Sequence, residues 1–218
     1  DIFPMISALL KEFQRNHWWI VQIAPNVNKF DHGIMRLNEF GLTRLKLAPY
    51  ASGLVNLSLD ESNLLSVLKK KWRYYLRQGQ KKDITIDCFD GNSSQMELLL
   101  NKYKKLQKDK EFSGLSSSLI IELACQTSKE WSFSLFIANE NGNQKQDDPL
   151  GMLVSVQHGD TATYLIGLTN NKGRSYQVNY VLLWQAILHS KSEGCNWFDI
   201  GGLDSTTPKG IKHFKSGI

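Results

Sequence analysis

The sequence predicts an α/β (α+β) fold in which helices flank a mixed β-sheet. From Ile84 onwards the expected order is strand, two helices, three antiparallel-type strands, a long helix and a terminal strand. Helices and strands also alternate before residue 60, which resembles the end of the same unit. The composition is 41% hydrophobic and 22% charged, as in globular proteins. Such an order packs best as a sheet with helices on both faces.

The first part of the chain predicts two helices and three short strands. Apolar residues at helical spacing predict a helix over 3–15, and a second helix over 30–40 ends at Gly41. Alternating apolar residues predict strands over 18–23, 42–47 and 54–59. We place a domain boundary near Leu59, so residues 1–59 form the closing part of a first domain and residues 60–218 form a second.

The second domain begins with a helix that Asp60 caps and that runs to about Gln78, before Gly79. Leucines and aromatic residues form the stripe of this helix that faces the core. The remaining pattern predicts, in order, a strand over 84–88, helices over 96–108 and 117–126, and strands over 131–138, 150–157 and 161–168.

The C-terminal fifty residues carry the most functional information. A predicted helix over 175–193 ends at Gly194, and a short strand over 197–200 runs into Gly201 and Gly202. Glycine tolerates positive φ and lets backbone approach a ligand closely. A glycine and a basic-aromatic cluster follow at 210–215. We interpret this region as an acyl-transfer or anion site; the alternative is an ordinary turn beside a solvated lysine.

Charge and cysteine usage restrict the classes of partner. A net charge of +5 and a pI near 9.0 suit an anionic partner such as a nucleotide, a phosphate or RNA. Three distant cysteines show no metal-ligand spacing, which favours a reducing compartment, and we expect a cytoplasmic protein without a metal. No signal peptide or apolar run of membrane-spanning length is visible. The chain is expected to be a segment of a longer polypeptide.

Three stretches, 64–79, 167–187 and 198–202 together with 210–215, are similar to a known family. They resemble the FemABX-like branch of the GNAT acyltransferases, the peptidoglycan interpeptide-bridge aminoacyltransferases and their acetyltransferase relatives. The resemblance implies a GNAT-like mixed sheet in 60–218, preceded by the closing part of another GNAT-like domain. It also implies that the family's chain continues past Ile218 into another strand.

The resemblance further implies an acyltransferase that forms an amide on an amine. The expected donor is aminoacyl-tRNA, used as a co-substrate without any other cofactor, and the expected acceptor is a UDP-linked or lipid-linked peptidoglycan precursor. A lipid-linked acceptor is compatible with peripheral membrane contact. Two alternatives stay open: an acetyl-CoA- or acyl-CoA-dependent N-acyltransferase acting on an amino-sugar or polysaccharide precursor, and a non-catalytic GNAT-fold module that binds RNA or another anion.

The catalytic residues implied by the resemblance lie at the C-terminal end. Lys215 would stabilise the negative charge that develops on the ester carbonyl, Phe214 would pack behind it, and Asp199 would orient or neutralise the lysine. We expect strand-like alternation here to point His213 away, so His213 is left out. No Gly-x-Ser-x-Gly nucleophile motif is present, which favours direct transfer.

The candidate substrate-binding residues fall into three groups. Lys69, Arg73 and Arg77 are four residues apart and could hold phosphates along one helix face, unless that face is merely solvated. Arg174 and Asn179 follow a loop with one glycine, so the glycine-rich CoA signature is absent, and both could be structural instead. The third group lies near the glycine turn and comprises Tyr164, Gly201 and Gly202. The segment 104–112 lacks an arginine often used by the family for the precursor.

Overall fold

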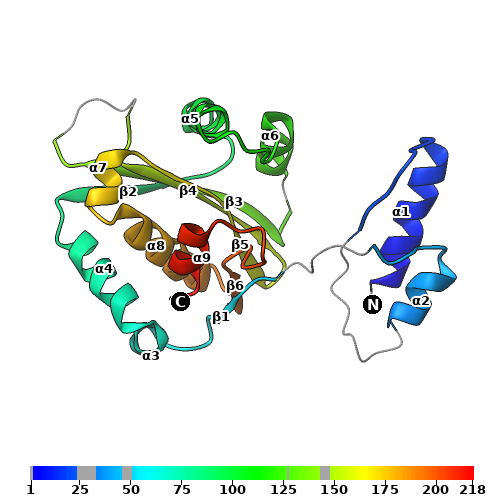
Figure 1. Ribbon diagram of the computed structural model, residues 1–218, viewed down its shortest axis with the longest axis horizontal. Coiled ribbons are helices and arrows are strands. Elements are labelled where there is room, and N and C mark those ends of the chain that lie inside the picture. The colour runs from blue at the N-terminus through cyan, green and yellow to red at the C-terminus, as the bar shows by residue number, and fades with distance from the viewer. Residues whose placement is uncertain (1, 24–32, 46–50, 127, 143–147) are drawn as a thin grey trace. The chain divides into compact units, whose positions relative to one another are not determined.

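The computed structural model describes residues 2–23, 33–45, 51–126, 128–142 and 148–218 (Figure 1). The chain divides into two compact units, Asp1–Ala48 and Pro49–Ile218, which are described separately. The predicted boundary near Leu59 lies further along the chain. The division comes earlier because strand β1, Leu54–Asn56, pairs with strand β6 of the second unit. That the first unit is the end of another GNAT-like domain stays a prediction.

The first unit contains helices α1, Phe3–Arg15, and α2, Gly33–Glu39. The ring of Phe3 stacks on that of Phe40, with centroids 6.2 Å apart. The predicted strand over 18–23 is wrong, and so is the described part, 42–45, of the next predicted strand; residues 46–47 lie outside the described residues. A strand is stable only when another strand pairs with it, and the described part of this unit contains no strand that could do so.

In the second unit the described residues form one mixed sheet, which confirms the predicted fold class. Its strands are β1, β2 (Ile84–Phe89), β3 (Trp131–Glu140), β4 (Gly151–His158), β5 (Thr161–Thr169) and β6 (Trp197–Asp199). They lie in the order β1-β6-β5-β4-β3-β2. Only the pairing of β5 with β6 is parallel among these strands.

Helices cover both faces of this sheet (Figure 1). One face packs against α5 (Gln95–Lys110) and α6 (Ser117–Cys125), and the other against α3 (Glu61–Val67), α4 (Lys70–Gln80), α8 (Val178–Ser192) and α9 (Lys209–Lys215). Because strand side chains alternate, Leu135 enters the core under α5 and α6 while Phe136 enters the core under α8. Among the described residues, no helix is long and apolar enough to cross a membrane.

The helix predicted from Asp60 to Gln78 is divided in two. Its start is as predicted, since the Asp60 carboxylate accepts a 2.8 Å hydrogen bond from the backbone N–H of Asn63. The chain is extended at Leu68 and Lys69, where α3 ends and α4 begins. Gly79 does not end α4. A Cβ there would lie 2.4 Å from the Val181 side chain, so this glycine lets α4 approach α8 closely.

Two further differences concern the C-terminal region. The helix predicted over 175–193 corresponds to α8, which starts three residues later because Gln177 adopts φ 62°, and a separate short helix, α7 (Asn171–Ser175), precedes it. Residues 209–215 form the helix α9 rather than the strand-like segment we expected. Pro208 suits the start of a helix, and the basic residues in the last turn of α9 interact favourably with the helix dipole.

Candidate functional site

The strand β6 ends in a glycine turn that organises the site. Gly201 has φ +70°, and its N–H donates a 2.7 Å hydrogen bond to the carboxylate of Asp199. The hydroxyl of Ser52 donates to the same carboxylate oxygen. A Cβ on Gly201 would lie 3.0 Å from Lys215 Nζ and 3.2 Å from the carbonyl oxygen of Tyr164. The turn therefore requires glycine both for its conformation and for space.

Lys215 projects from the last turn of α9 towards this turn. Its side chain is buried, with 7% exposed, and Nζ lies 4.5 Å from the centre of the Tyr164 ring. Among the described residues this ring is the contact of Nζ, which makes no hydrogen bond or ion pair with them. Burial lowers the pKa of Lys215, and the negative charge of Asp199 opposes this by raising it. A buried ammonium thus retains donors that are available to a substrate.

Tyr164 directly follows the part of β5 that pairs with β6. The parallel pairing covers only Thr161 to Thr163 of β5, after which β5 continues to Thr169 while β6 has ended. The register with β4 also shifts here, leaving Leu165 as an extra residue. Burial raises the pKa of Tyr164 to about 12, so its hydroxyl stays neutral. The ring therefore offers the lysine an uncharged aromatic face.

Phe214 holds α9 against the neighbouring helices. Its ring lies 5.0 Å from that of Tyr180 and 6.2 Å from that of Trp72, measured between centroids. The indole N–H of Trp72 donates a 3.1 Å hydrogen bond to the Phe214 carbonyl. The backbone N–H of Lys69 donates a 2.8 Å hydrogen bond to the carbonyl of Gly217. These contacts fix the helix that carries Lys215.

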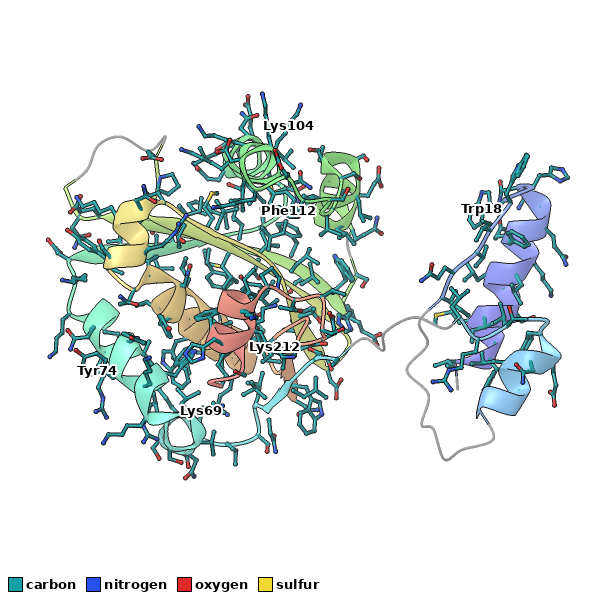
Figure 2. All side chains as sticks on the ribbon, viewed as in Figure 1. Trp18, Lys69, Tyr74, Lys104, Phe112 and Lys212 are labelled. Atoms are coloured by element: carbon teal, nitrogen blue, oxygen red, sulfur yellow. The ribbon has the colours of Figure 1, made fainter. Side chains whose placement is uncertain are left out.

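The structure does not bring the predicted basic row together at one site. Arg73 Nη1 donates to the carbonyls of Leu65 and Ser66, at 3.3 and 2.6 Å, and so caps the end of α3. Arg77 is exposed, with no hydrogen bond or ion pair to a described residue. Lys69 lies at the start of α4 (Figure 2). Each of the three basic residues therefore has a different environment.

The start of α7 is already satisfied by its own side chains. The N–H of Gly173 donates a 2.7 Å hydrogen bond to the side chain of Asn170, and a Cβ on Gly173 would lie 2.0 Å from the Leu150 carbonyl oxygen. Glu140 accepts a 2.5 Å hydrogen bond from Lys172, which places a carboxylate nearby. The glycine here is explained by packing, and an amide that could bind an anion is occupied.

Arg174 and Asn179 lie on either side of the break between α7 and α8. The guanidinium of exposed Arg174 donates a 3.2 Å hydrogen bond to the Thr169 carbonyl, and Asn179 is partly buried in the first turn of α8. Neither contacts the cluster formed by Asp199, Gly201 and Lys215 in any described hydrogen bond. Gly202 has ordinary φ and follows Gly201 directly.

Residues 63–216 match the family described as the acetyltransferase (GNAT) domain. The chain belongs to this family. It is a FemABX-like GNAT acyltransferase, as the resemblance implied. No match was found among the curated proteins.

Two solved structures have the same fold as this GNAT acyltransferase. FemX has a TM-score of 0.73 and 14% identity, over 99% of this chain and 72% of FemX. L-PGS from Bacillus licheniformis has a TM-score of 0.58 and 10% identity, over 93% of this chain and 58% of L-PGS. The chain therefore spans only part of each protein.

Sequence reasoning missed two supporting residues of this acyltransferase. Ser52 contacts Asp199 across 147 positions, and no local pattern signals such a pair. Trp72 was assigned to the core stripe, but the hydrogen-bonding capacity of its indole N–H offered a signal, since a buried indole normally finds an acceptor. Among the described residues there is no cluster of three or more His, Cys, Asp or Glu side chains that could hold a metal ion.

Proposed function

We propose that this acyltransferase moves an aminoacyl group from aminoacyl-tRNA to an amine of a UDP-linked or lipid-linked peptidoglycan precursor in the cytoplasm. The observation that carries the proposal is Lys215, a buried residue whose ammonium lies against the Tyr164 ring and forms no hydrogen bond or ion pair with a described residue. It lies at the glycine turn that follows β6, next to the point where the pairing of β5 with β6 ends. This resembles the arrangement expected of FemABX-like enzymes.

The chemistry needs a cation at this place. The acceptor amine attacks the ester carbonyl carbon, and the carbonyl oxygen becomes an oxyanion in the tetrahedral adduct. Lys215 donates to that oxygen, and the low dielectric of a buried site strengthens the interaction. The C–O bond to the tRNA ribose then breaks, the ribose oxygen leaves with a proton released by the amine, and the new amide remains.

The neighbours of Lys215 support this role. Asp199 raises the pKa of the lysine against the effect of burial, and so favours the charged form that stabilises an oxyanion. Ser52 and the Gly201 N–H both donate to Asp199, which fixes its carboxylate. Tyr164 remains a neutral phenol and contacts the ammonium through its ring. No covalent enzyme intermediate is required.

The start of α7 favours an RNA donor over an acyl-CoA donor. In CoA-dependent GNAT enzymes the backbone amides at this helix start bind pyrophosphate, whereas here Asn170 accepts from the Gly173 N–H. The carboxylate of Glu140 lies beside Lys172 and would repel a pyrophosphate. Acyl-CoA is therefore the less favoured donor, and CoA-dependent N-acylation is the less favoured reaction.

Product analysis by mass spectrometry tests the proposal. The protein is incubated with UDP-linked or lipid-linked precursors and either a panel of aminoacyl-tRNAs or acetyl-CoA. We expect an aminoacylated precursor from at least one tRNA, and a loss of about 100-fold in turnover for Lys215→Met. Lys209→Met, on an exposed lysine of the same helix, is the matched control. Three outcomes would each refute the proposal: acetyl-CoA is the only donor that gives a product, none of the donors gives a product, or Lys215→Met keeps full turnover.

A further inference from the structure

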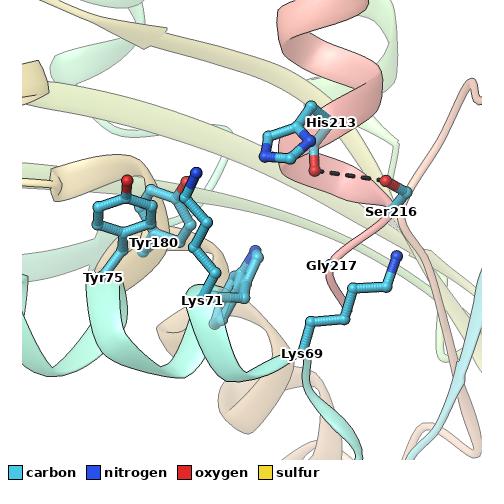
Figure 3. Close-up of a pocket in the computed structure, with 8 residues that line it drawn as sticks. Lys69, Lys71, Tyr75, Tyr180, His213, Ser216 and Gly217 are labelled. Atoms are coloured by element: carbon cyan, nitrogen blue, oxygen red, sulfur yellow. Dashed lines mark hydrogen bonds between the residues drawn. The ribbon is translucent and has the colours of Figure 1, made fainter.

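A small pocket lies between α4, α8 and α9, beside the helix that carries Lys215 (Figure 3). Its volume is about 50 Å³. The described residues that line it are Lys69, Lys71, Trp72, Tyr75, Tyr180, His213, Ser216 and Gly217. Only Lys69 was a candidate from the sequence. His213 lines the pocket because α9 is a helix, whereas the expected strand-like alternation had set this residue aside.

The lining of this pocket combines basic and polar groups with aromatic rings, and the Lys71 ammonium lies 5.8 Å from the centre of the Tyr75 ring. Lys69, Lys71 and His213 supply nitrogen donors and Ser216 supplies a hydroxyl, and no acidic residue is among the described lining residues. Neither lysine forms an ion pair with a described residue. Figure 3 shows the Lys69 side chain extending beside Gly217 and Ser216, and the Lys71 side chain extending beside Tyr75 and Tyr180. The pocket is therefore suited to an anion.

The sequence of α4 is unfavourable unless this charge has a use. Three successive lysines, at positions 69–71, stand at the helix start, and no acid is present in the first turn. Positive charge at a helix N-terminus opposes the helix dipole and costs stability. Local rules are broken most often at functional sites, where another interaction compensates. An anion bound between Lys69 and Lys71 would supply that compensation.

The size of the pocket restricts the anion. With a volume of about 50 Å³ the pocket is small, which suits one compact anionic group such as a phosphate, while the rest of a larger ligand extends beyond it. Tyr75 and Tyr180 form an aromatic wall, with ring centroids 5.1 Å apart. Such rings can stack a base or pack against a sugar that extends beyond the phosphate.

We propose that this pocket binds one phosphate of a nucleotide-bearing substrate, with the attached nucleoside against the two tyrosines. The substrate class rests on the proposed function, which requires both an RNA donor and an acceptor that can carry a uridine diphosphate. Both contain a phosphate next to a nucleoside, so both have the chemistry that this pocket recognises. The experiment below assigns the site to one of them.

The place of the pocket suits a substrate whose reacting end lies at Lys215. His213 and Ser216 line the pocket, and Lys215 stands between them on the same helical turn. Trp72 lines the pocket too and donates to the carbonyl of Phe214. Residues in a helix rise by about 1.5 Å each, so the backbone that carries Lys215 lies within one turn of the backbone at His213 and Ser216.

Equilibrium binding with matched lysine variants tests this site. The double variant Lys69→Gln/Lys71→Gln is compared with Lys70→Gln, an exposed lysine between them that does not line the pocket. Two probes are titrated: a fluorescein-labelled tRNA acceptor-stem minihelix, followed by anisotropy, and a UDP-sugar, followed by calorimetry. We expect the double variant to lose about tenfold in affinity for one probe. If the minihelix is that probe, the slope of the logarithm of its binding constant against the logarithm of salt concentration should become less steep by about 1.

Each outcome decides the assignment. A loss confined to the minihelix assigns the pocket to the donor, and a loss confined to the UDP-sugar assigns it to the acceptor. Unchanged binding of both probes, or an equal loss in Lys70→Gln, overturns the proposal. Binding is measured without turnover, so Lys215→Met should bind both probes normally. A protein that transfers no aminoacyl group yet shows the lysine-specific loss would refute the proposed function while keeping the phosphate site.

Discussion

Two glycines follow neighbouring strands of the same sheet, and their surroundings differ. Gly201, after β6, has φ +70° and leaves room for the ammonium of Lys215. Gly173, after β5, leaves room for the carbonyl of Leu150, and its N–H is bonded to the side chain of Asn170. Sequence inspection treats both as loop glycines near an anion site. The ammonium of Lys215, beside Gly201, forms no ion pair with a described residue, whereas Lys172, next to Gly173, is paired with Glu140.

The difference teaches that a glycine shows where the backbone is crowded, and not which ligand is bound there. Around Gly201 the crowding atom is the ammonium nitrogen of Lys215, which forms no hydrogen bond or ion pair with a described residue, so the space serves chemistry. Around Gly173 the crowding atom is a backbone carbonyl, so the space serves packing. Three variants test this contrast, in decreasing order of expected effect.

Gly201→Ala should have the largest effect. The added Cβ displaces Lys215 Nζ, which lies 3.0 Å from its position, so we expect turnover to fall by about 100-fold. The positive φ adds about 1 kcal/mol of destabilisation. Gly159→Ala is the control for φ alone, since Gly159 has φ +61° and nothing within 4 Å of a Cβ. Equal turnover in the two variants, measured by product formation, would remove the role assigned to Gly201.

Gly173→Ala should change stability and leave the chemistry intact. Its Cβ would lie 2.0 Å from a backbone oxygen, so the chain must shift, and we expect a loss of about 3 kcal/mol in the free energy of unfolding. Urea denaturation measures this loss, and turnover per folded molecule should stay within about twofold, because this change is far smaller than that from losing one oxyanion donor. A stable variant with impaired turnover would instead show that the start of α7 binds a substrate.

Apart from its loss of turnover, Lys215→Met should have a small effect on stability, which is a gain near neutral pH. Burial lowers the pKa of Lys215 in the folded state below its unfolded value of about 10.4. Between those pKa values the unfolded chain binds more protons, so the stability of the unsubstituted protein rises with pH. The variant should be more stable by about 1 kcal/mol at neutral pH, and this advantage should shrink as pH rises. Urea denaturation at several pH values measures it, and a constant difference would contradict the argument.

Features set by neighbouring residues could be predicted from the sequence. Asp60 caps its helix as its residue type suggests, and Gly41 ends α2 with φ +75°. The order of elements from Ile84 onwards was sufficient to predict a mixed sheet, because few arrangements bury the apolar faces of such a series. The cluster of Tyr164, Asp199, Gly201 and Lys215 was nominated before its geometry was known, through the family resemblance.

Features set by distant residues could not be predicted. The apolar segment 18–23 has the pattern of a strand, but pairing requires a neighbour that the pattern does not contain. Arg73 has the spacing of a phosphate ligand, but its guanidinium is bound to the carbonyls of α3 across the break at Leu68 and Lys69. Periodicity records which face a residue occupies, and not which group meets it there.

The hydrogen bond between the Trp72 indole and the Phe214 carbonyl has a mechanical consequence. α9 is anchored by its backbone to α4, so the backbone from which Lys215 projects cannot shift unless the whole short helix moves. Gly217 lies so close to Trp72 that an added Cβ would be 2.6 Å from the indole, which blocks rolling in that direction. The backbone at Lys215 is therefore fixed in place, and the reacting ester must be brought to the lysine.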